Sequence, residues 1–463
     1  MKARLLRLGN QLSESYWFVP TLMAVAALLL ATIMVWIDVR FGADWMSGVP
    51  WLYASRPDGA RSLLSSIGGS MIGVAGTTFS VTIAAVVYAS GQYGPRLLSN
   101  FMSDRGNQVT LGTFIATFLY SLIVVRTIHN AEDGQPAFVP QLAVLIGVLL
   151  VLSSIAVLIY FIHHVPSRIH INSVIERVGT RLIEEIDKRF PVFVGAPLEA
   201  SDDDPRVPAA LRPGASEAGR AGVVAEDTGY IQLIDQERLI ETAREHDLVL
   251  RLHYQPGDFA RVGNVLLEAC PPGAVDDDAA DDLRAAFAFS ARRTALQDLR
   301  FLIDELVEIA ARALSPGVND PFTANSCLDW LGAAIADFAR RNLPSPLRGD
   351  KDGALRVVTY PQSFADVVDR AFGALAQYAS ADMIAGRRFL ATLGDVALAC
   401  EAPSRVAVLA RQTEAFRELA DGNLSGANRA AVVDRADALA RILADPGYKA
   451  LLRDRQGWLG GSA

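Results

Sequence analysis

Glycine and serine recur along an uncharged segment, residues 67–90, at steps of three and four. This spacing stacks small side chains on one face of a helix, and threonines add hydroxyl groups elsewhere on it. Small residues let helices approach closely within a membrane, and the same helix repeated around the axis of an oligomer would line a pore. The pattern is compatible with either role, helix packing or pore lining. The candidate residues are Gly69, Gly73, Gly76, Thr77 and Ser80.

A second group of candidate residues lies in a turn-rich stretch, residues 314–323. Asp320 followed by Pro321 predicts the start of a helix, with the aspartate as N-cap and the proline at the first helical position. Gly317 can adopt a positive φ in the preceding turn. The same helix start could instead hold a small molecule or an anion. The candidate residues for such a cytoplasmic ligand are Asn319, Asp320 and Thr323.

Sequence motifs of the common enzyme classes are missing from the chain. It contains no phosphate loop, no HExxH pair and no serine elbow, and its six histidines are too widely spread to form an evident metal set. The acidic runs at 202–204 and 276–282 are expected to be a solvated linker and a helix start, and neither needs a metal. We therefore expect a protein that is not an enzyme and that uses no metal or cofactor.

The glycine-containing segment is the second of four long apolar runs in the chain. Each is long enough to cross a hydrocarbon core of about 30 Å as a helix. A secretory signal peptide does not explain the first run, because the run is too long and no small-residue cleavage site follows before Asp38. None of the runs contains Asp, Glu, Lys, Arg or His, which disfavours a proton-coupled carrier. The expected spans are residues 17–37, 67–90, 109–125 and 139–162, within a transmembrane domain of residues 1–165.

Lys and Arg residues are unevenly distributed among the segments that flank these spans. Ten lie in the N-terminal segment, the second loop and the segment after the fourth span, whereas four lie in the first and third loops. The positive-inside rule therefore predicts that both termini, and with them the C-terminal region, are cytoplasmic. Three cysteines with no close pair among them fit a reducing compartment. The expected location is the bacterial inner membrane.

The C-terminal residues are expected to form a mostly α-helical cytoplasmic region with a small inserted β module. A helical stalk is expected over residues 166–194, and a Pro- and Gly-rich stretch, 195–227, predicts a flexible linker. Short β-like segments at 228–272, with a short helix expected between them at 236–245, resemble the small β-barrels of lipoyl domains. This stretch has no lysine to carry a prosthetic group, which excludes a covalent carrier and leaves a structural or ring-forming module.

Residues 276–456 are expected to form the α-helical cytoplasmic domain. Apolar residues at helical spacing predict one long helix over 279–313, and a short strand is expected at 355–360. The remaining helical patterns cover 364–384, 387–400, 404–420 and 426–443.

Several stretches of the chain together resemble one bacterial family. They are FSVTIAAVVYASGQYGPRLL (79–98), LGTFIATFLYSLIVVRTI (111–128), YFIHHV (160–165), GYIQLID (229–235), PGDFARVG (256–263) and ALSPGVNDPFTA (313–324). In this order they resemble the domain-of-unknown-function 2254 family of predicted bacterial membrane proteins. The resemblance covers most of the chain and implies an inner-membrane protein of this topology. It implies no particular activity and no catalytic residues. Gly94 departs from the family, in which serine is usual at that position.

Two functions from different classes remain compatible with these features. In the first, the chain is an oligomeric, passive ion channel, with the second span facing the axis and the cytoplasmic region forming a vestibule or gate. In the second, it is a membrane-anchored sensor or scaffold that binds a ligand or a partner protein through its cytoplasmic domain. We favour the channel, because an anchor needs neither four uncharged spans nor a polar-lined helix. The expected partners are the lipid bilayer, further copies of the chain and a small ion or a protein, whereas the net charge of −8 argues against nucleic acid.

Overall fold

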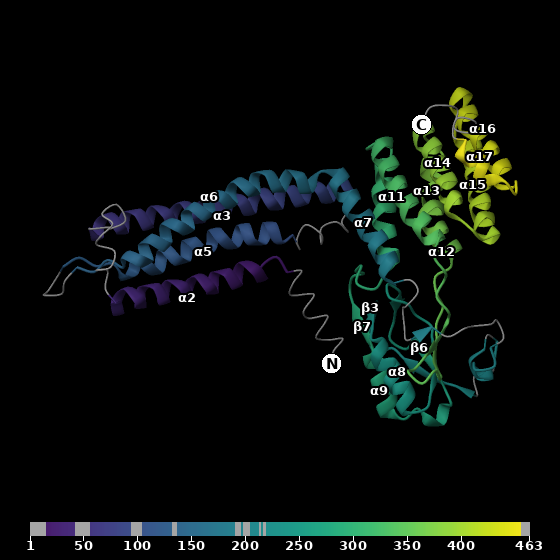
Figure 1. Cartoon of the computed structure of the whole chain (residues 1–463), viewed down its shortest axis with the longest axis horizontal. Helices are drawn as coiled ribbons and strands as arrows, with labels where there is room; N and C mark the ends of the chain where they lie inside the picture. Colours follow the sequence, from purple (N-terminus) through teal and green to yellow (C-terminus); the bar gives the residue numbers. More distant parts are fainter. Residues whose placement is uncertain are drawn as a thin grey trace. The chain divides into compact units, whose positions relative to one another are not determined.

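The chain folds as two compact units, Leu8–Ser173 and Val174–Ala463. Figure 1 shows helices in the first unit, and strands and helices in the second. The computed structural model describes residues 15–41, 56–93, 104–131, 137–189, 196–197, 204–212, 214–215 and 219–454. Gly94 and parts of the expected linker therefore lie outside the described residues.

Four apolar helices form the N-terminal unit, and each is long and apolar enough to cross a membrane. They are α2 (Phe18–Phe41), α3 (Pro57–Tyr93), α5 (Arg105–Thr127) and α6 (Gln141–Ile169). The four apolar helices predicted from the sequence are thus confirmed. Each helix continues past its predicted apolar run at one end or both, because polar residues can extend the backbone hydrogen bonding beyond the apolar stretch.

Helix α5 is the most buried of these four helices and packs against the other three. Its Tyr120 hydroxyl donates a hydrogen bond of 2.8 Å to the carbonyl oxygen of Ala143 in α6. One turn earlier, the hydroxyl oxygens of Thr117 and Ser154 lie 3.0 Å apart. These three buried hydroxyl groups thus have hydrogen-bond partners on the neighbouring helix, which offsets the cost of placing them among apolar side chains.

Helix α7 (Ile171–Arg189) follows directly after α6 and supplies the first element of the C-terminal unit. Four of its apolar side chains, at a four-residue step, are buried there: Val174, Val178, Leu182 and Ile186. The chain segment expected to be a stalk therefore has one buried apolar side, which packs within this unit.

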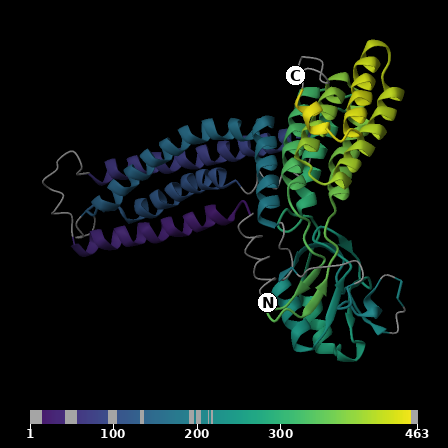
Figure 2. The ribbon, with the colours of Figure 1, turned by 45° about the vertical axis from the view of Figure 1, so that its right-hand side comes forward.

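Two β-sheets occupy one part of the C-terminal unit, and the helices α10 to α17 occupy another (Figure 2). The larger sheet has the strand order β1-β8-β9-β4-β6-β2, and all its neighbouring strands are antiparallel except β4 and β9. The smaller sheet has the order β5-β3-β7. The strands are β1 (Ala196–Pro197), β2 (Ala221–Val224), β3 (Gly229–Ile234), β4 (Val249–Leu252), β5 (Phe259–Ala260), β6 (Val265–Cys270), β7 (Phe287–Ser290), β8 (Leu347–Gly349) and β9 (Leu355–Val358).

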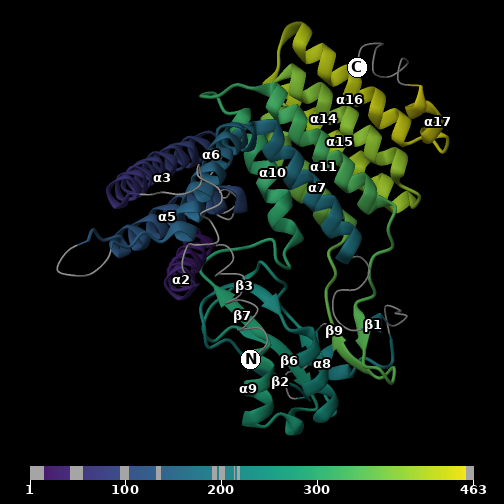
Figure 3. The same ribbon diagram turned by 60° about the vertical axis from the view of Figure 1, so that its left-hand side comes forward.

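The expected β-barrel is not confirmed, because neither sheet closes on itself. The sheets also include strands from outside residues 228–272. Strands β1 and β2 come from the range expected to be a flexible linker, and β7 and β8 come from the range expected to be helical, whereas β9 lies where a short strand was expected, at 355–360. After α11 the chain leaves the helices, forms β8 and β9, and returns to the helices at α12, as Figure 3 shows. Sequence periodicity missed these pairings because they join segments far apart in the chain.

The helices of the C-terminal unit are confirmed as its main component, with two corrections to their bounds. The single helix expected at 279–313 is wrong, because β7 separates α9 from α10. The helix expected at 364–384 is interrupted by a π-helical turn, Asp369–Gly373. The helices are α8 (Gln236–Glu245), α9 (Asp277–Ala285), α10 (Leu299–Ala313), α11 (Pro321–Ala339), α12 (Phe364–Val368), α13 (Ala374–Ala379), α14 (Met383–Ala399), α15 (Pro403–Asn423), α16 (Gly426–Leu443) and α17 (Tyr448–Arg453).

Candidate functional site

The candidate residues on α3 lie on the side of the helix that does not pack within the N-terminal unit. Gly69, Gly73, Gly76, Thr77 and Ser80 are all exposed in the single chain, and we call them the small-residue face. A Cβ atom at any of the three glycines would meet no described atom within 4 Å. The opposite side of α3 is buried and carries Leu64, Ile67, Met71, Ala75, Thr78 and Thr82. Close packing against its own bundle therefore does not account for the small-residue face.

A groove of about 670 Å³ runs between α3 and α6 next to this face. Gly69, Gly73 and Thr77 line it from α3, and Leu158 and Phe161 line it from α6. The lining does not include the other two members of the small-residue face. The structure thus brings three of the five candidate residues to one concave surface and leaves two beside it.

The turn before α11 is held together by its own polar groups. Asp320 is the N-cap of α11, with Pro321 in its first turn, as predicted from the sequence. The Asp320 carboxylate accepts hydrogen bonds from the Thr323 backbone N–H (3.1 Å) and hydroxyl (2.6 Å). The expected positive φ at Gly317 is wrong, because Asn319 adopts it instead, at 50°. Asn is among the few residues that tolerate this conformation. The structure therefore brings Asn319, Asp320 and Thr323 together and gives the last two a role in capping.

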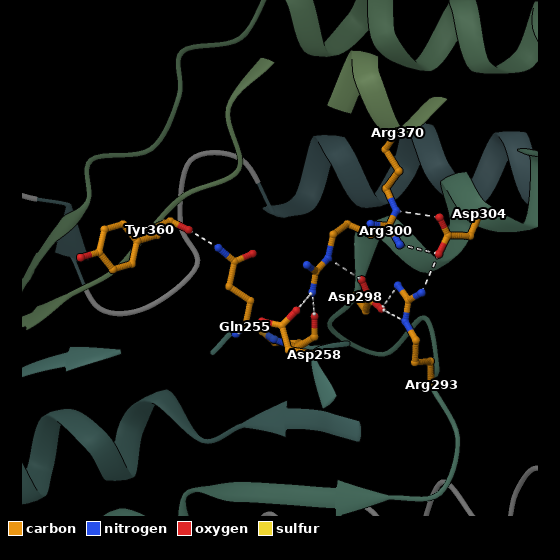
Figure 4. A network of polar contacts seen from close by, with 9 residues as sticks. Gln255, Asp258, Arg293, Asp298, Arg300, Asp304, Tyr360 and Arg370 are labelled. Atoms are coloured by element: carbon orange, nitrogen blue, oxygen red, sulfur yellow. Dashed lines mark hydrogen bonds and ion pairs between the residues drawn. The ribbon is translucent and has the colours of Figure 1, made fainter. Parts of the chain in front are cut away.

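Six charged side chains of the C-terminal unit form a continuous set of ion pairs, the Arg–Asp network (Figure 4). Arg293 bridges two carboxylates, since its Nε lies 2.8 Å from Asp298 and its Nη1 lies 2.5 Å from Asp304. On its other side, Asp304 accepts hydrogen bonds of 2.6 and 2.7 Å from Arg370. The members are Asp258, Arg293, Asp298, Arg300, Asp304 and Arg370. With three arginines and three aspartates, the network has no net charge.

These ion pairs favour the charged forms of Asp304 and Arg293. Burial alone would raise the pKa of Asp304, but the guanidinium groups of Arg370 and Arg293 hold it below its usual value. Burial alone would lower the pKa of Arg293, but the carboxylates of Asp298 and Asp304 raise it above its usual value. Because its members come from loops, from α10 and from the π-helical turn, the network ties the smaller sheet to the helices.

The loop that precedes β5 reaches the network through a glycine. Gly257 has a φ of 93°, which favours glycine, and a Cβ atom there would overlap the Asp298 carboxylate. Arg300 binds this loop at two points, because its Nη2 lies 2.8 Å from the Pro256 carbonyl oxygen and 2.8 Å from the Asp258 carboxylate. The conformation of Gly257 therefore allows residues 256–258 (PGD) to contact Asp298 and Arg300 of the network.

A cavity of about 450 Å³ lies beside the Arg–Asp network. Strands β4 and β8 and the segment after β9 form one side of it, and α10 and α12 form the other. Arg300 and Arg370 of the network line it, together with Arg348 from β8. The Arg348 side chain is 1% exposed, so its guanidinium group is almost fully buried. This cavity is the second concave site that the described residues define clearly.

Sequence reasoning identified the small-residue face but missed the network and the cavity. Their residues come from segments between 252 and 370 that no single motif unites. One local feature of the sequence hints at the network: Arg300 and Asp304 are charged residues four positions apart among the apolar residues of α10. In the part of the chain that the structure describes, no cluster of three or more His, Cys, Asp or Glu side chains is arranged to hold a metal.

Four candidate membrane-spanning helices followed by a folded C-terminal unit define a multi-pass membrane protein. The family described as "Predicted membrane protein (DUF2254)" matches residues 13–395. The chain belongs to this family, and the resemblance noted in its sequence is confirmed. The matched range includes the small-residue face, the Arg–Asp network and every residue that lines the cavity.

Among curated proteins, the chain is similar to two uncharacterized mycobacterial proteins, Rv1290c of Mycobacterium tuberculosis and Mb1321c of Mycobacterium bovis. Each is 30% identical over 452 residues, which cover 95% of this chain and 82% of the relative. The similarity thus extends across both units. No solved structure matches the chain.

Proposed function

We propose that the chain is a non-enzymatic, oligomeric protein of the bacterial inner membrane that conducts small ions passively. In this proposal the small-residue face of α3 from several copies lines the conduction path. Both termini and the C-terminal unit are cytoplasmic, in agreement with the distribution of Lys and Arg between the loops. The C-terminal unit then supplies the part of the protein that responds to cytoplasmic signals.

The observation that carries this proposal is the position of the small-residue face on α3. All five of its residues are exposed, while the opposite side of the same helix is buried in its own bundle. An apolar bilayer gives no reason to place glycine and hydroxyl groups toward lipid, whereas a second copy or a water-filled path does. Membrane oligomers are mostly symmetric, so one such face per chain is repeated around an axis.

Cysteine accessibility tests whether this face is wet. We expect Gly73→Cys, Thr77→Cys and Ser80→Cys to react with water-soluble thiol reagents in the membrane. Leu152→Cys is the matched control, because Leu152 lies on α6 and is 58% exposed in an apolar setting. If the three positions react no faster than the Leu152→Cys control and the unmodified chain, the face is not wet and the channel proposal fails.

Ion flux tests conduction itself. We expect the purified protein in lipid vesicles to pass small ions, and a variant with Gly73→Leu, Thr77→Leu and Ser80→Leu to lose this flux while it still assembles. A Leu152→Ala variant should keep the wild-type flux. Flux that survives the triple substitution would show that ions pass elsewhere and would reject this lining.

A second candidate function, a membrane-anchored ligand sensor, is favoured by the cavity in the C-terminal unit. Its volume of about 450 Å³ falls in the range of small-molecule sites. In this case α3 would serve only for helix packing between copies. Uniform protection of the three cysteines, together with ligand binding by the C-terminal unit, would favour the sensor over the channel.

A further inference from the structure

The turn before α11 presents apolar side chains on the outside of the C-terminal unit. Phe322, in the first turn of α11, is 69% exposed, and Val318, in the preceding turn, is 44% exposed. Phe322 is the most exposed large apolar side chain that the structure describes in this unit. A single exposed apolar residue is ordinary on a protein surface, so the meaning of this one depends on what lies beside it.

The exposed part of this turn carries no charge, and its backbone is held by hydrogen bonds. The backbone N–H groups of Val318 and Asn319 both donate to the Ser315 carbonyl oxygen, at 3.0 and 2.9 Å. The one acid of the turn, Asp320, binds Thr323 and caps α11. The exposed residues are Pro316, Gly317, Val318, Asn319 and Phe322. An uncharged surface with an exposed aromatic ring suits an apolar partner.

Helices α7 and α11 run in the same direction. Gly179 of α7 lies against Trp330 of α11, since a Cβ atom at Gly179 would be 2.5 Å from the ring. Eight residues later in α7, Asp187 lies 2.8 Å from Arg341, which follows Trp330 by eleven residues. Both contacts advance along the chain together, so the first turns of the two helices lie at the same end. By this spacing Phe322 is level with the start of α7, about one helical turn before Val174.

The start of α7 is tied to the membrane by the chain itself. Helix α6 is long and apolar enough to span a membrane and ends at Ile169, and α7 begins at Ile171. Val174 is the first residue of α7 that belongs to the C-terminal unit. Even a fully extended chain would place it within about 18 Å of the end of α6, whatever the angle between the two helices. The first turn of α7, and that of α11 beside it, is therefore the end nearest the membrane.

Helix α14 begins at this same end. Asp329 of α11 pairs with Arg388 of α14, and three residues later a Cβ atom at Gly332 would overlap Thr392. Helix α14 is therefore parallel to α11, and its first turn is level with that of α11. Ile384, in this turn, is 37% exposed. Exposed apolar side chains thus come from two helix starts at the end of the unit where the chain leaves the membrane.

We propose that Phe322 and Val318, with Ile384 beside them, insert into the interfacial layer of the lipid bilayer and hold this end of the C-terminal unit against the membrane. Aromatic side chains favour the level of the lipid headgroups, and apolar side chains add affinity in proportion to the area that they bury there. A lipid surface is the partner because the chain connects this end directly to the membrane-spanning α6. The proposal does not depend on ion conduction by α3, so its test and the tests of the channel are independent.

Fluorescence quenching by spin-labelled lipid tests the proposal in the full-length protein. Bimane is attached to Phe322→Cys in a chain that carries Cys270→Ser, because the other two cysteines are buried. The Cys270→Ser chain alone corrects for any label on those two. The protein is reconstituted into phosphatidylcholine vesicles with or without a lipid that carries a nitroxide near its headgroup. We expect this lipid to quench the label at Phe322→Cys at least about threefold more strongly than a label at a control position far from the membrane.

The control position is Leu343, labelled as Leu343→Cys in the same chain. Leu343 is 40% exposed and lies beyond the opposite end of α11, a helix about 28 Å long. Its label should be quenched only weakly, because a nitroxide acts at short range. Equal quenching at the two positions, or no quenching at Phe322→Cys, would reject the proposal.

A second pair of variants tests whether Phe322 drives the insertion. With the label at Val318→Cys, Phe322→Asp should reduce quenching by at least about half, because a carboxylate resists entry into the bilayer. Leu343→Asp should leave this quenching unchanged. Unchanged quenching in Phe322→Asp would show that Phe322 does not anchor this end and would overturn the proposal. Rapid crosslinking of Phe322→Cys between two chains, without quenching by the lipid, would show that a second copy covers the residue and would also overturn it.

Discussion

The carboxylate of Asp38, near the end of α2, accepts a hydrogen bond of 2.9 Å from the backbone N–H of Ala143, in the first turn of α6. It accepts a second, of 3.1 Å, from the N–H of Leu142. The first N–H groups of a helix have no partner within that helix, and its N-terminus favours negative charge. Asp38 thus caps a helix that begins about 100 residues later in the chain, and its 5% exposure shows that water contributes little there.

Loss of this cap should destabilise the N-terminal unit. We expect Asp38→Ala to lower the free energy of unfolding by about 1–2 kcal/mol and Asp38→Asn by less, because the amide oxygen can still accept one of the two hydrogen bonds. Thermal unfolding in detergent measures the difference. Asp58→Ala is the control, since Asp58, among the residues that the structure describes, accepts a hydrogen bond from Asn130 at an exposed position. Equal melting temperatures for Asp38→Ala and the wild type would contradict the capping role.

Two glycines in the N-terminal unit should respond oppositely to alanine. A Cβ atom at Gly112 would lie 2.5 Å from the Met23 sulfur and 3.2 Å from the Pro20 Cα, so Gly112→Ala should cost about 1–3 kcal/mol. Gly73→Ala meets no described atom within 4 Å and should leave the stability of the single chain unchanged or slightly higher.

Melting temperatures of the two variants, measured in detergent at a concentration where the chain is monomeric, check this difference. If Gly73→Ala is destabilised as much as Gly112→Ala, the small-residue face packs within the chain, and its assignment as a free surface is wrong.

The packing of α7 within the C-terminal unit depends on Gly179. A Cβ atom at this position would lie 2.5 Å from the Trp330 ring of α11. Gly179→Ala should therefore displace the ring and weaken the packing of α7 by about 1–3 kcal/mol. Hydrogen exchange of the α7 amides should become faster in this variant. Thr180→Ala, at an exposed neighbouring position, should exchange as the wild type does.

The acid sensitivity of the C-terminal unit should depend on Asp304. Its pKa is lowered in the folded state, so its stabilising contribution is fully present above the unfolded value of about 3.9 and is lost as the pH falls through the lower folded value. Asp304→Asn should cost about 2–3 kcal/mol at neutral pH, because Arg293 and Arg370 lose the carboxylate that they share.

Melting temperatures between pH 3 and pH 7 provide the measurement for Asp304. The difference between Asp304→Asn and the wild type should be largest near neutral pH and should shrink below pH 4. Asp329→Asn is the control, because its pair with Arg388 is exposed and should contribute at most about 1 kcal/mol. A difference that does not change with pH would show that the Asp304 charge is unimportant.

Local sequence signals predicted some elements closely and others not at all. Helix α8 has the predicted bounds, 236–245, because Asp235 caps it and its charged and apolar residues alternate at helical spacing. Strand β7 was hidden inside an expected helix, because its pairing with β3, more than 50 residues earlier, outweighs its helical periodicity. Long-range pairing of this kind leaves no signal in a short window of sequence.

The same contrast applies to the candidate sites. The small-residue face could be predicted because all of its residues lie on one helix at regular spacing. That this face points away from its own bundle depends on three other helices and could not be predicted. The Arg–Asp network joins Asp258, Asp304 and Arg370 across more than 100 residues, so only the folded chain brings them together.

The hydroxyl groups near the small-residue face already donate their protons within α3. The hydroxyls of Ser70, Thr77 and Ser80 donate to the carbonyl oxygens four residues earlier, at 2.7, 3.1 and 2.9 Å. Each of these oxygens keeps its lone pairs, so the hydroxyls present electron-rich atoms and no free O–H to their surroundings. Chloride would find no donor among these three groups, whereas sodium or potassium could exchange hydration water for their oxygens. If this face lines a conduction path, as we propose, these hydrogen bonds within one helix would set a preference for cations over anions.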